Sequence, residues 1–162
     1  MEHPGLSTPL RILPAEPSDM ARLAALATAL HHSEGYAVEA NADALYAAIF
    51  DESAPVKLYA QLAWVEEQIV GFVLYYMGYD LLSASNGFHL ADIYVEEAYR
   101  HRGIGHKLVQ KVARDAHVAG GQWVSLTHLR ANVNAAKFYS ALGFTEVPVT
   151  FVAAGPKALA AL

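Results

Sequence analysis

The first half of the chain contains a short apolar stretch followed by two segments in which Ala and Leu recur at helical spacing. Residues 10–13 predict a short strand. Residues 17–32 place apolar side chains three and four positions apart, as an amphipathic helix does, and Ser18 stands where an N-cap is favoured. Residues 42–50 repeat this spacing directly behind Asn41, a second candidate N-cap. We therefore predict one strand and then two helices.

The middle of the chain changes to β-branched and aromatic residues. Residues 56–65 and 68–79 are both of this kind, and they predict an antiparallel hairpin with its turn at Glu66–Glu67. A turn-like Ser-Ala-Ser-Asn-Gly run follows, and residues 88–95 predict the next strand.

The last third returns to helical spacing and then becomes mixed. Residues 103–119 predict a helix whose inward face carries Ile104, Leu108, Val112 and Ala116. Residues 122–127 predict a strand. Asn134 is expected to cap a helix that ends at Leu142, and residues 144–152 predict a last strand.

The resulting order, β α α β β β α β α β, is that of an α/β domain with helices packed against a central sheet. The strands at 88–95 and 122–127 are joined through a helix and are expected to run parallel, whereas the hairpin region is antiparallel. The length suits one domain. We expect a single domain over residues 1–162, with a core within about 9–153 and a tail, 154–162, that is loose or forms a short helical turn.

Composition narrows the classes of function. Charged residues make up 17% of the chain, below the roughly 25% of typical soluble domains, so part of the surface suits a partner subunit. The net charge of −5 argues against nucleic acid and fits a cationic small substrate. None of the eight histidines forms a His-x-x-x-His or His-Glu-x-x-His pattern, so no metal is predicted. No signal peptide or membrane span can be identified, and we expect a cytoplasmic protein.

The stretch from Arg100 to Gly105 carries the clearest chemical signal. A strand, a Gly-x-Gly turn and a helix offer unpaired backbone N–H groups to an anion, and the helix dipole adds positive charge there. Arg100 and Arg102 can add charge-assisted hydrogen bonds. The alternative is a surface loop with solvated arginines. The stretch is neither a Rossmann fingerprint, because Leu108 stands where the third glycine belongs, nor a P-loop.

A second motif further along the chain strengthens the interpretation of the first motif as an anion-binding loop. Together they resemble the GNAT superfamily of acetyl-CoA-dependent N-acetyltransferases, which carries Gln/Arg-x-x-Gly-x-Gly/Ala and, later, Asn-x-x-Ala-x-x-Phe-Tyr-x-x-x-Gly-Phe. The matching residues are Arg100, Gly103, Gly105, Asn132, Ala135, Phe138, Tyr139, Gly143 and Phe144. The element Tyr75, Tyr76, Tyr79 and Asp80 looks like the diamine (spermidine/spermine) and thialysine branch. That branch often carries two adjacent carboxylates before the glycine loop, whereas this chain has Ala91–Asp92.

The resemblance implies a GNAT-like mixed, mostly antiparallel sheet with helices on both faces, acetyl-CoA as co-substrate, no metal, and a homodimer. It implies that the backbone of Tyr94 or Val95 polarises the thioester carbonyl and that Tyr139 donates a hydrogen bond to the leaving sulfur. The cofactor-binding residues it implies are Ile93, Tyr94, Val95, Arg100, His101, Arg102, Gly103, Ile104, Gly105, His106, Asn132, Lys137 and Tyr139.

Acetylation of an amine requires a group that accepts the proton which the ammonium loses. An amine of pKa about 10.4 is protonated at pH 7, and deprotonating it costs about 4.6 kcal/mol. Asp92 is the first candidate base, with Glu34, His32 or a water relay as alternatives. Tyr139 and Asp92 are thus the predicted catalytic residues. The predicted substrate-binding residues are Glu34, Tyr79, Asp80 and Asp92.

The predicted reaction is direct attack of a small primary amine on acetyl-CoA in a ternary complex. The acceptor would be a polyamine, a diamine or a lysine-like amino acid, held by charge and cation–π contacts. Two alternatives remain open. One is an acetyltransferase of peptide or protein N-termini, and the other is a non-catalytic CoA-binding module.

Overall fold

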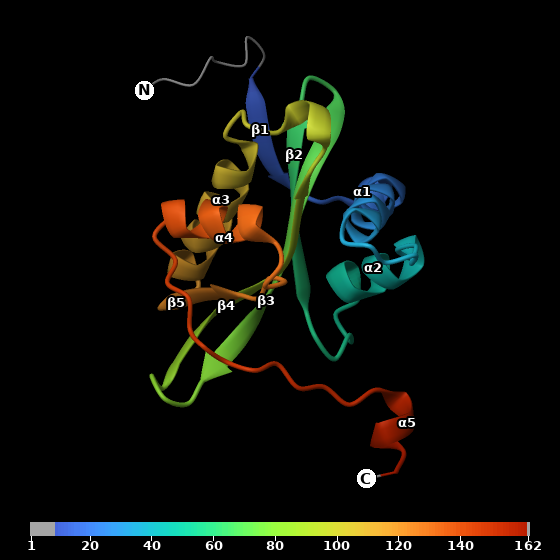
Figure 1. Cartoon of the computed structure of the whole chain (residues 1–162). Helices are drawn as coiled ribbons and strands as arrows, with labels where there is room; N and C mark the ends of the chain where they lie inside the picture. The colour runs from blue at the N-terminus through green and yellow to red at the C-terminus, as the bar shows by residue number, and fades with distance from the viewer. Residues whose placement is uncertain (1–8, 162) are drawn as a thin grey trace. The chain divides into compact units, whose positions relative to one another are not determined.

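The computed structural model describes residues 9–161, and these form two compact units divided between Thr127 and His128. The first unit holds one five-stranded sheet in the order β1-β2-β3-β4-β5 (Figure 1). Neighbouring strands are antiparallel except for the parallel pair β4–β5. The strands are β1 Leu10–Pro14, β2 Leu58–Val65, β3 Gln68–Asp80, β4 Ser85–Val95 and β5 Trp123–Leu126. The predicted fold class, a mixed and mostly antiparallel sheet with one parallel pair, is confirmed.

Helices cover both faces of this sheet. Helices α1 (Met20–Ser33) and α2 (Ala42–Phe50) lie on one face, and α3 (Ile104–Val118) lies on the other (Figure 1). The α1 face buries a cluster that includes Leu23, Leu26, Leu62, Phe72 and Leu74. The predicted inward face of α3 is confirmed, because Ile104, Leu108, Val112 and Ala116 are all buried. Fully burying a side chain of this size stabilises the fold by about 1.5–3 kcal/mol.

Of the two helix starts predicted in the first half of the chain, one follows the capping rules. Asn41 Oδ1 accepts from the Ala44 N–H at 2.9 Å and begins α2 as expected. Ser18 does not cap α1. It lies in a 3-10 turn, η1 (Pro17–Asp19), and α1 begins at Met20. The Asp19 carboxylate there accepts from the Glu16 N–H, so a reciprocal capping box replaces the predicted serine cap.

Strand β4 has an irregularity that matters for the site. The register runs from Leu74–Asp92 directly to Tyr75–Leu90, so Ala91 is an extra residue, a β-bulge. Strand β5 pairs with β4 only as far as Leu90. The bulge therefore coincides with the point at which β5 leaves β4.

The second unit differs from the sequence prediction in two respects. Helix α4 (Val133–Ala141) is capped by Asn132, whose Oδ1 accepts from the Ala135 N–H at 3.0 Å, and not by Asn134. The strand predicted at 144–152 was wrong. These residues pair with no strand of the described chain, Pro148 lacks a ladder donor, and the apolar side chains Val147, Val149, Phe151 and Val152 are exposed. A short helix, α5 (Pro156–Leu159), lies in the tail.

Candidate active site

The outer edge of β4 beyond Leu90 is left without a strand partner in the described structure. The Glu96 N–H donates to Val70 O at 2.9 Å, which sets the alternation of the β3–β4 ladder. By that alternation Tyr94 directs its N–H toward β3, whereas Ile93 and Val95 direct theirs toward the side that β5 has left. Of the predicted pair Tyr94 and Val95, the ladder therefore leaves Val95 as the backbone donor for a ligand at this edge.

The loop after β4 leads directly into α3. It contains the 3-10 turn η2 (Glu97–Tyr99), and two of its residues adopt left-handed backbone conformations, His101 with φ 61° and Gly103 with φ 77°. Gly103 is the N-cap of α3, and no side chain caps the first turn of the helix. The N–H groups of Ile104, Gly105 and His106 therefore face outward at the positive end of the helix dipole.

The two arginines of this loop shape it as well as charging it. Arg100 Nε donates to Val95 O at 2.9 Å, and the guanidinium lies 5.4 Å from the centre of the Tyr94 ring. Arg102 donates to Ala98 O at 2.9 Å and lies over the Tyr99 ring at 5.3 Å. Each bond uses only part of a five-donor guanidinium, so the remaining N–H groups can still bind an anion.

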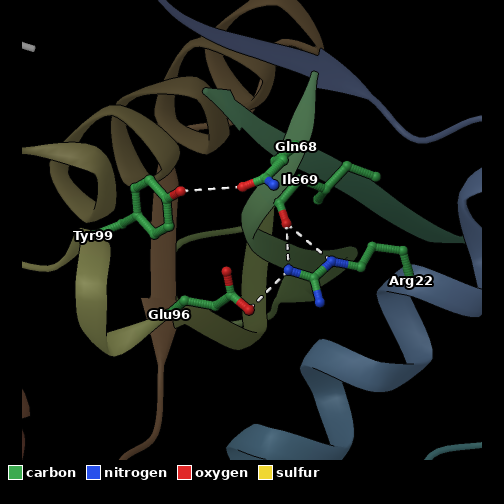
Figure 2. Close-up of polar contacts among 5 residues, drawn as sticks. All are labelled: Arg22, Gln68, Ile69, Glu96 and Tyr99. Carbon is green, nitrogen blue, oxygen red and sulfur yellow. Dashed lines mark hydrogen bonds and ion pairs between the residues drawn. The ribbon is translucent and has the colours of Figure 1, made fainter. Parts of the chain in front are cut away.

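The start of the loop is tied to the opposite layer of the fold (Figure 2). Arg22 of α1 donates to Ile69 O from Nε at 3.0 Å and from Nη2 at 2.8 Å. The same Nη2 lies 2.8 Å from Glu96 Oε1. Tyr99 also donates to Gln68 Oε1 at 3.1 Å. Sequence reasoning missed Arg22, because nothing local in the α1 sequence indicates that its side chain reaches the end of β4.

Asp92 lies on the α1 face of the sheet, opposite Leu74. Burial raises the pKa of its carboxyl above the ordinary value, and the nearby His31 lowers it by a smaller amount. Tyr94, two residues on, packs against the α1 core cluster. His31 accordingly reaches the neighbourhood of Asp92 from the end of α1, whereas the predicted residues His32 and Glu34 are both exposed.

His89 is a second titratable group on this part of β4 that sequence reasoning missed. Its Nδ1 lies 3.0 Å from Ser125 Oγ of β5, and its ring centre lies 5.2 Å from that of Tyr76. Burial lowers the pKa of His89 below its ordinary value. His89 stands three residues before Asp92 in the sequence. In a regular strand this spacing would put the two side chains on opposite faces, so the spacing alone does not bring them together.

The remaining predicted acceptor residues do not gather around Asp92. Asp80 Oδ2 accepts from the Ser83 N–H at 2.8 Å and from Ser83 Oγ at 2.6 Å, which lowers the pKa of Asp80 and closes the β3–β4 turn. Tyr79 is 65% exposed beside it. Six strand positions separate Asp80 from Leu74, the partner of Asp92, or about 20 Å at 3.3 Å per residue. One small amine cannot contact both carboxylates.

Tyr75, part of the aromatic element that resembles the diamine branch, belongs to the core. Its hydroxyl donates to Asp115 of α3, and Gln61 Nε2 donates to the Tyr75 hydroxyl at 3.2 Å. Burial and the Asp115 carboxylate raise the pKa of Tyr75. Lys111 pairs with the same carboxylate. This tyrosine therefore ties α3 to the sheet.

Tyr139 lies on α4, in the second unit, and is buried there. Its ring packs against Phe138 and Phe144 at centre distances of 5.1 and 5.6 Å, and it stacks on His128 at 6.2 Å. Asn132 is used as the α4 cap, and Lys137 is exposed.

Comparison with known proteins agrees with this geometry. The family model described as Acetyltransferase (GNAT) family matches residues 23–144, which include most of α1, strands β2 to β5, the glycine loop and α4. The chain belongs to the acetyltransferase (GNAT) family.

Three individual proteins illustrate the likeness to GNAT members. An L-ornithine N5-acetyltransferase from Arabidopsis thaliana is 37% identical over 75 residues, which are 46% of this chain and 33% of that protein. A thialysine N-epsilon-acetyltransferase from Bos taurus is 41% identical over 79 residues, 49% of this chain and 46% of that protein. The matched region thus spans less than half of these relatives. An aminoglycoside N-acetyltransferase solved in complex with CoA has the same fold, with a TM-score of 0.76, 19% identity and coverage of 93% of this chain and 97% of that one.

Membership of the GNAT family supports acetyl-CoA as the co-substrate, and the residues present fit it. A Cβ added at Gly103 would meet no atom within 4 Å, so the space before the first turn of α3 is open to a phosphate. Arg100 and Arg102 flank that space, and the Val95 N–H lies at the free edge that leads away from it. Among residues 9–161, no helix is long and apolar enough to cross a membrane.

Proposed function

We propose that this chain is an acetyl-CoA-dependent N-acetyltransferase that acetylates a primary amine of a small molecule. The observation that carries the proposal is the free outer edge of β4, with the half-buried Asp92 beside it and the uncapped first turn of α3 at its end. The first turn of α3 suits a pyrophosphate, the free edge of β4 suits a thioester, and Asp92 suits a cationic amine. Acetyl-CoA supplies the activated acetyl group.

The residues divide the work as follows. Arg100, Arg102 and the first turn of α3 hold the pyrophosphate. The Val95 N–H polarises the acetyl carbonyl and stabilises the negative charge that develops on its oxygen as the amine attacks. Asp92 holds the acceptor ammonium beside the thioester. Tyr139 donates a hydrogen bond to the departing sulfur; full proton transfer from a phenol of pKa about 10 to a thiolate near 8.5 is uphill by roughly 2 kcal/mol.

The acceptor class is inferred from two supports. The relatives with the quoted identities are named for ornithine and thialysine, both of which carry a primary amine at the end of an alkyl chain. The acidic balance of the chain, −5 at pH 7, favours cationic acceptors. A polyamine, a diamine or a lysine-like amino acid fits both. We also retain a single domain and a homodimer as expectations.

The test is a thiol-release assay with acetyl-CoA against a panel of thialysine, ornithine, diamines, polyamines and N-terminal peptides. We expect turnover with at least one small amine and none with the peptides. Asp92→Asn should raise the KM for the amine much more than it raises the dissociation constant of acetyl-CoA, measured by calorimetry. Turnover only with peptides would assign the chain to N-terminal acetylation instead. Binding of acetyl-CoA without turnover of any amine would make it a CoA-binding module.

A further inference from the structure

The bulge at Ala91 brings two titratable side chains to one face of the sheet. Residues three apart on a regular strand point to opposite faces. Here His89 lies opposite Tyr76 and Asp92 lies opposite Leu74, and residues 74 and 76 share a face of β3. His89 and Asp92 therefore emerge on the same face, two steps of the partner strand apart, or about 7 Å.

In the described part of the chain, the polar contact of the His89 ring is made by Nδ1, and Nε2 is left available to a ligand. The Ser125 hydroxyl oxygen, 3.0 Å from Nδ1, can accept from Nδ1–H in both the neutral and the charged ring, so the ring keeps its orientation when it titrates. The titratable groups that face this corner are Tyr76 from β3, Asp92 from β4 itself, and His31, which reaches toward Asp92 from α1. Burial lowers the pKa of His89, so the ring is neutral and able to accept a proton at pH 7.

The position of His89 along β4 places it beside the reacting atoms of the proposed function. The pair His89–Ser125 comes one residue before Leu90–Leu126, the last pair that joins β4 to β5. Beyond it begins the free edge at which the thioester is proposed to lie. The intervening Ala91 is small and exposed, so it leaves room for an amine between His89 and Asp92.

We propose that His89 is the general base of this chain, accepting through Nε2 the proton that the acceptor ammonium loses, while Asp92 holds that ammonium. This inference rests on the proposed acetyl transfer. The ammonium gives its proton to Nε2, and the neutral nitrogen forms a bond to the acetyl carbon. The carbon–sulfur bond breaks and CoA leaves as the thiolate. The second proton lost by the attached nitrogen converts this thiolate to the thiol, and the proton on Nε2 is released to water. Overall, one ammonium and one acetyl-CoA give one amide, one CoA thiol and one proton released to water.

An imidazole suits this role better than the carboxylate does. With ordinary pKa values of about 6.5 and 3.9, proton transfer from an amine is favoured about 400-fold more to a histidine than to an aspartate. Because burial lowers the pKa of His89 and raises that of Asp92, this ratio is an upper limit. An ionised Asp92 is also more useful as the anion that holds the ammonium, since protonation would end that attraction.

The experiment compares wild type, His89→Ala and the control His117→Ala, with ornithine or thialysine as the acceptor. His117 is an exposed histidine at the end of α3, which packs on the other face of the sheet from His89. We expect His89→Ala to lower kcat at pH 7 by about 100-fold, as loss of a general base does, with an unchanged dissociation constant for acetyl-CoA. Added imidazole should restore kcat of His89→Ala at least tenfold and leave the other two proteins unaffected. A kcat within twofold of wild type, or no rescue by imidazole, would overturn the assignment.

The pH profile gives a second measurement if the alanine variant fails to fold. In wild type, kcat should decline at acid pH with a midpoint lower than the ordinary histidine value of about 6.5, because burial lowers the pKa at which the ring becomes protonated. His89→Gln keeps much of the volume and should lose this decline; a variant that retains the wild-type acid limb refutes the base role. A wild-type protein that acetylates no amine in the panel refutes the proposed function itself, and the base role with it. The two failures are therefore distinguishable.

Discussion

Arg22 is expected to stabilise both the fold and the cofactor loop, because it joins α1 to the end of β4 (Figure 2). Arg22→Met keeps the apolar stem and removes the guanidinium. The two bonds to Ile69 O contribute about 1–2 kcal/mol in all. The ion pair with Glu96 adds about 0.5 kcal/mol, a small figure because 41% and 33% of the two side chains are exposed. We expect a loss of about 2 kcal/mol, or roughly 4–8 °C in Tm for a chain of this size.

The assay is thermal and urea unfolding of Arg22→Met, Glu96→Gln and the double variant. The pair should show a coupling free energy of about 0.5 kcal/mol. Arg11→Met is the matched control, since Arg11 also donates to a carbonyl near the β2–β3 turn but makes one such bond, with a distant and exposed glutamate as its ion partner. It should cost about 0.5 kcal/mol.

The same variants test the link to the loop. Because Glu96 immediately precedes η2, Arg22→Met should weaken acetyl-CoA binding severalfold in calorimetry while kcat at saturation stays near wild type. Equal destabilisation by Arg22→Met and Arg11→Met, with no coupling to Glu96 and unchanged acetyl-CoA affinity, would refute the reasoning.

Three further substitutions test other parts of the structure. Tyr139→Phe should lower kcat by about tenfold in steady-state assays with little change in acetyl-CoA affinity, and an unchanged kcat would remove its assigned role. Gly103→Val should abolish acetyl-CoA binding in calorimetry, because a β-branched residue is strained at φ 77°; normal binding would contradict the phosphate role of the loop. Gly87→Ala should lose about 3 kcal/mol in urea unfolding, because its Cβ would lie 2.3 Å from Trp123 O, whereas Gly155→Ala, with open space around it, should be neutral.

Much of the fold could be predicted because its signals are local and repeated. The inward face of α3 returns at helical spacing over four positions, and a tertiary override would have to break all of them. Asn41 and the β2–β3 turn are read from a few neighbouring residues in the same way. The glycine loop was also predictable, since left-handed φ values and an uncapped helix start require few residue types.

The predictions that failed depend on partners distant in sequence. Residues 144–152 have strand-like composition, but a strand exists only where another edge pairs with it, and composition does not supply that edge. Ser18 is a good N-cap in isolation, yet the Glu16–Asp19 capping box closes the 3-10 turn η1 there, and α1 begins one residue later than a Ser18 cap would set it, at Met20. Arg22 had no sequence signal, because its partners are 47 and 74 residues away.

The site proposed for the amine depends on the β-bulge at Ala91 of β4, which the regular alternation of side chains along a strand does not predict. Strict alternation would place Leu90, Asp92 and Tyr94 on one face and His89 on the other. The extra residue Ala91 instead leaves Leu90 with Tyr75 on the α3 face and places Asp92 opposite Leu74 on the α1 face. Removing the bulge would therefore separate a candidate base from a candidate anion by the thickness of the sheet. The position at which a second carboxylate is missing is thus the position that allows His89 to work beside Asp92.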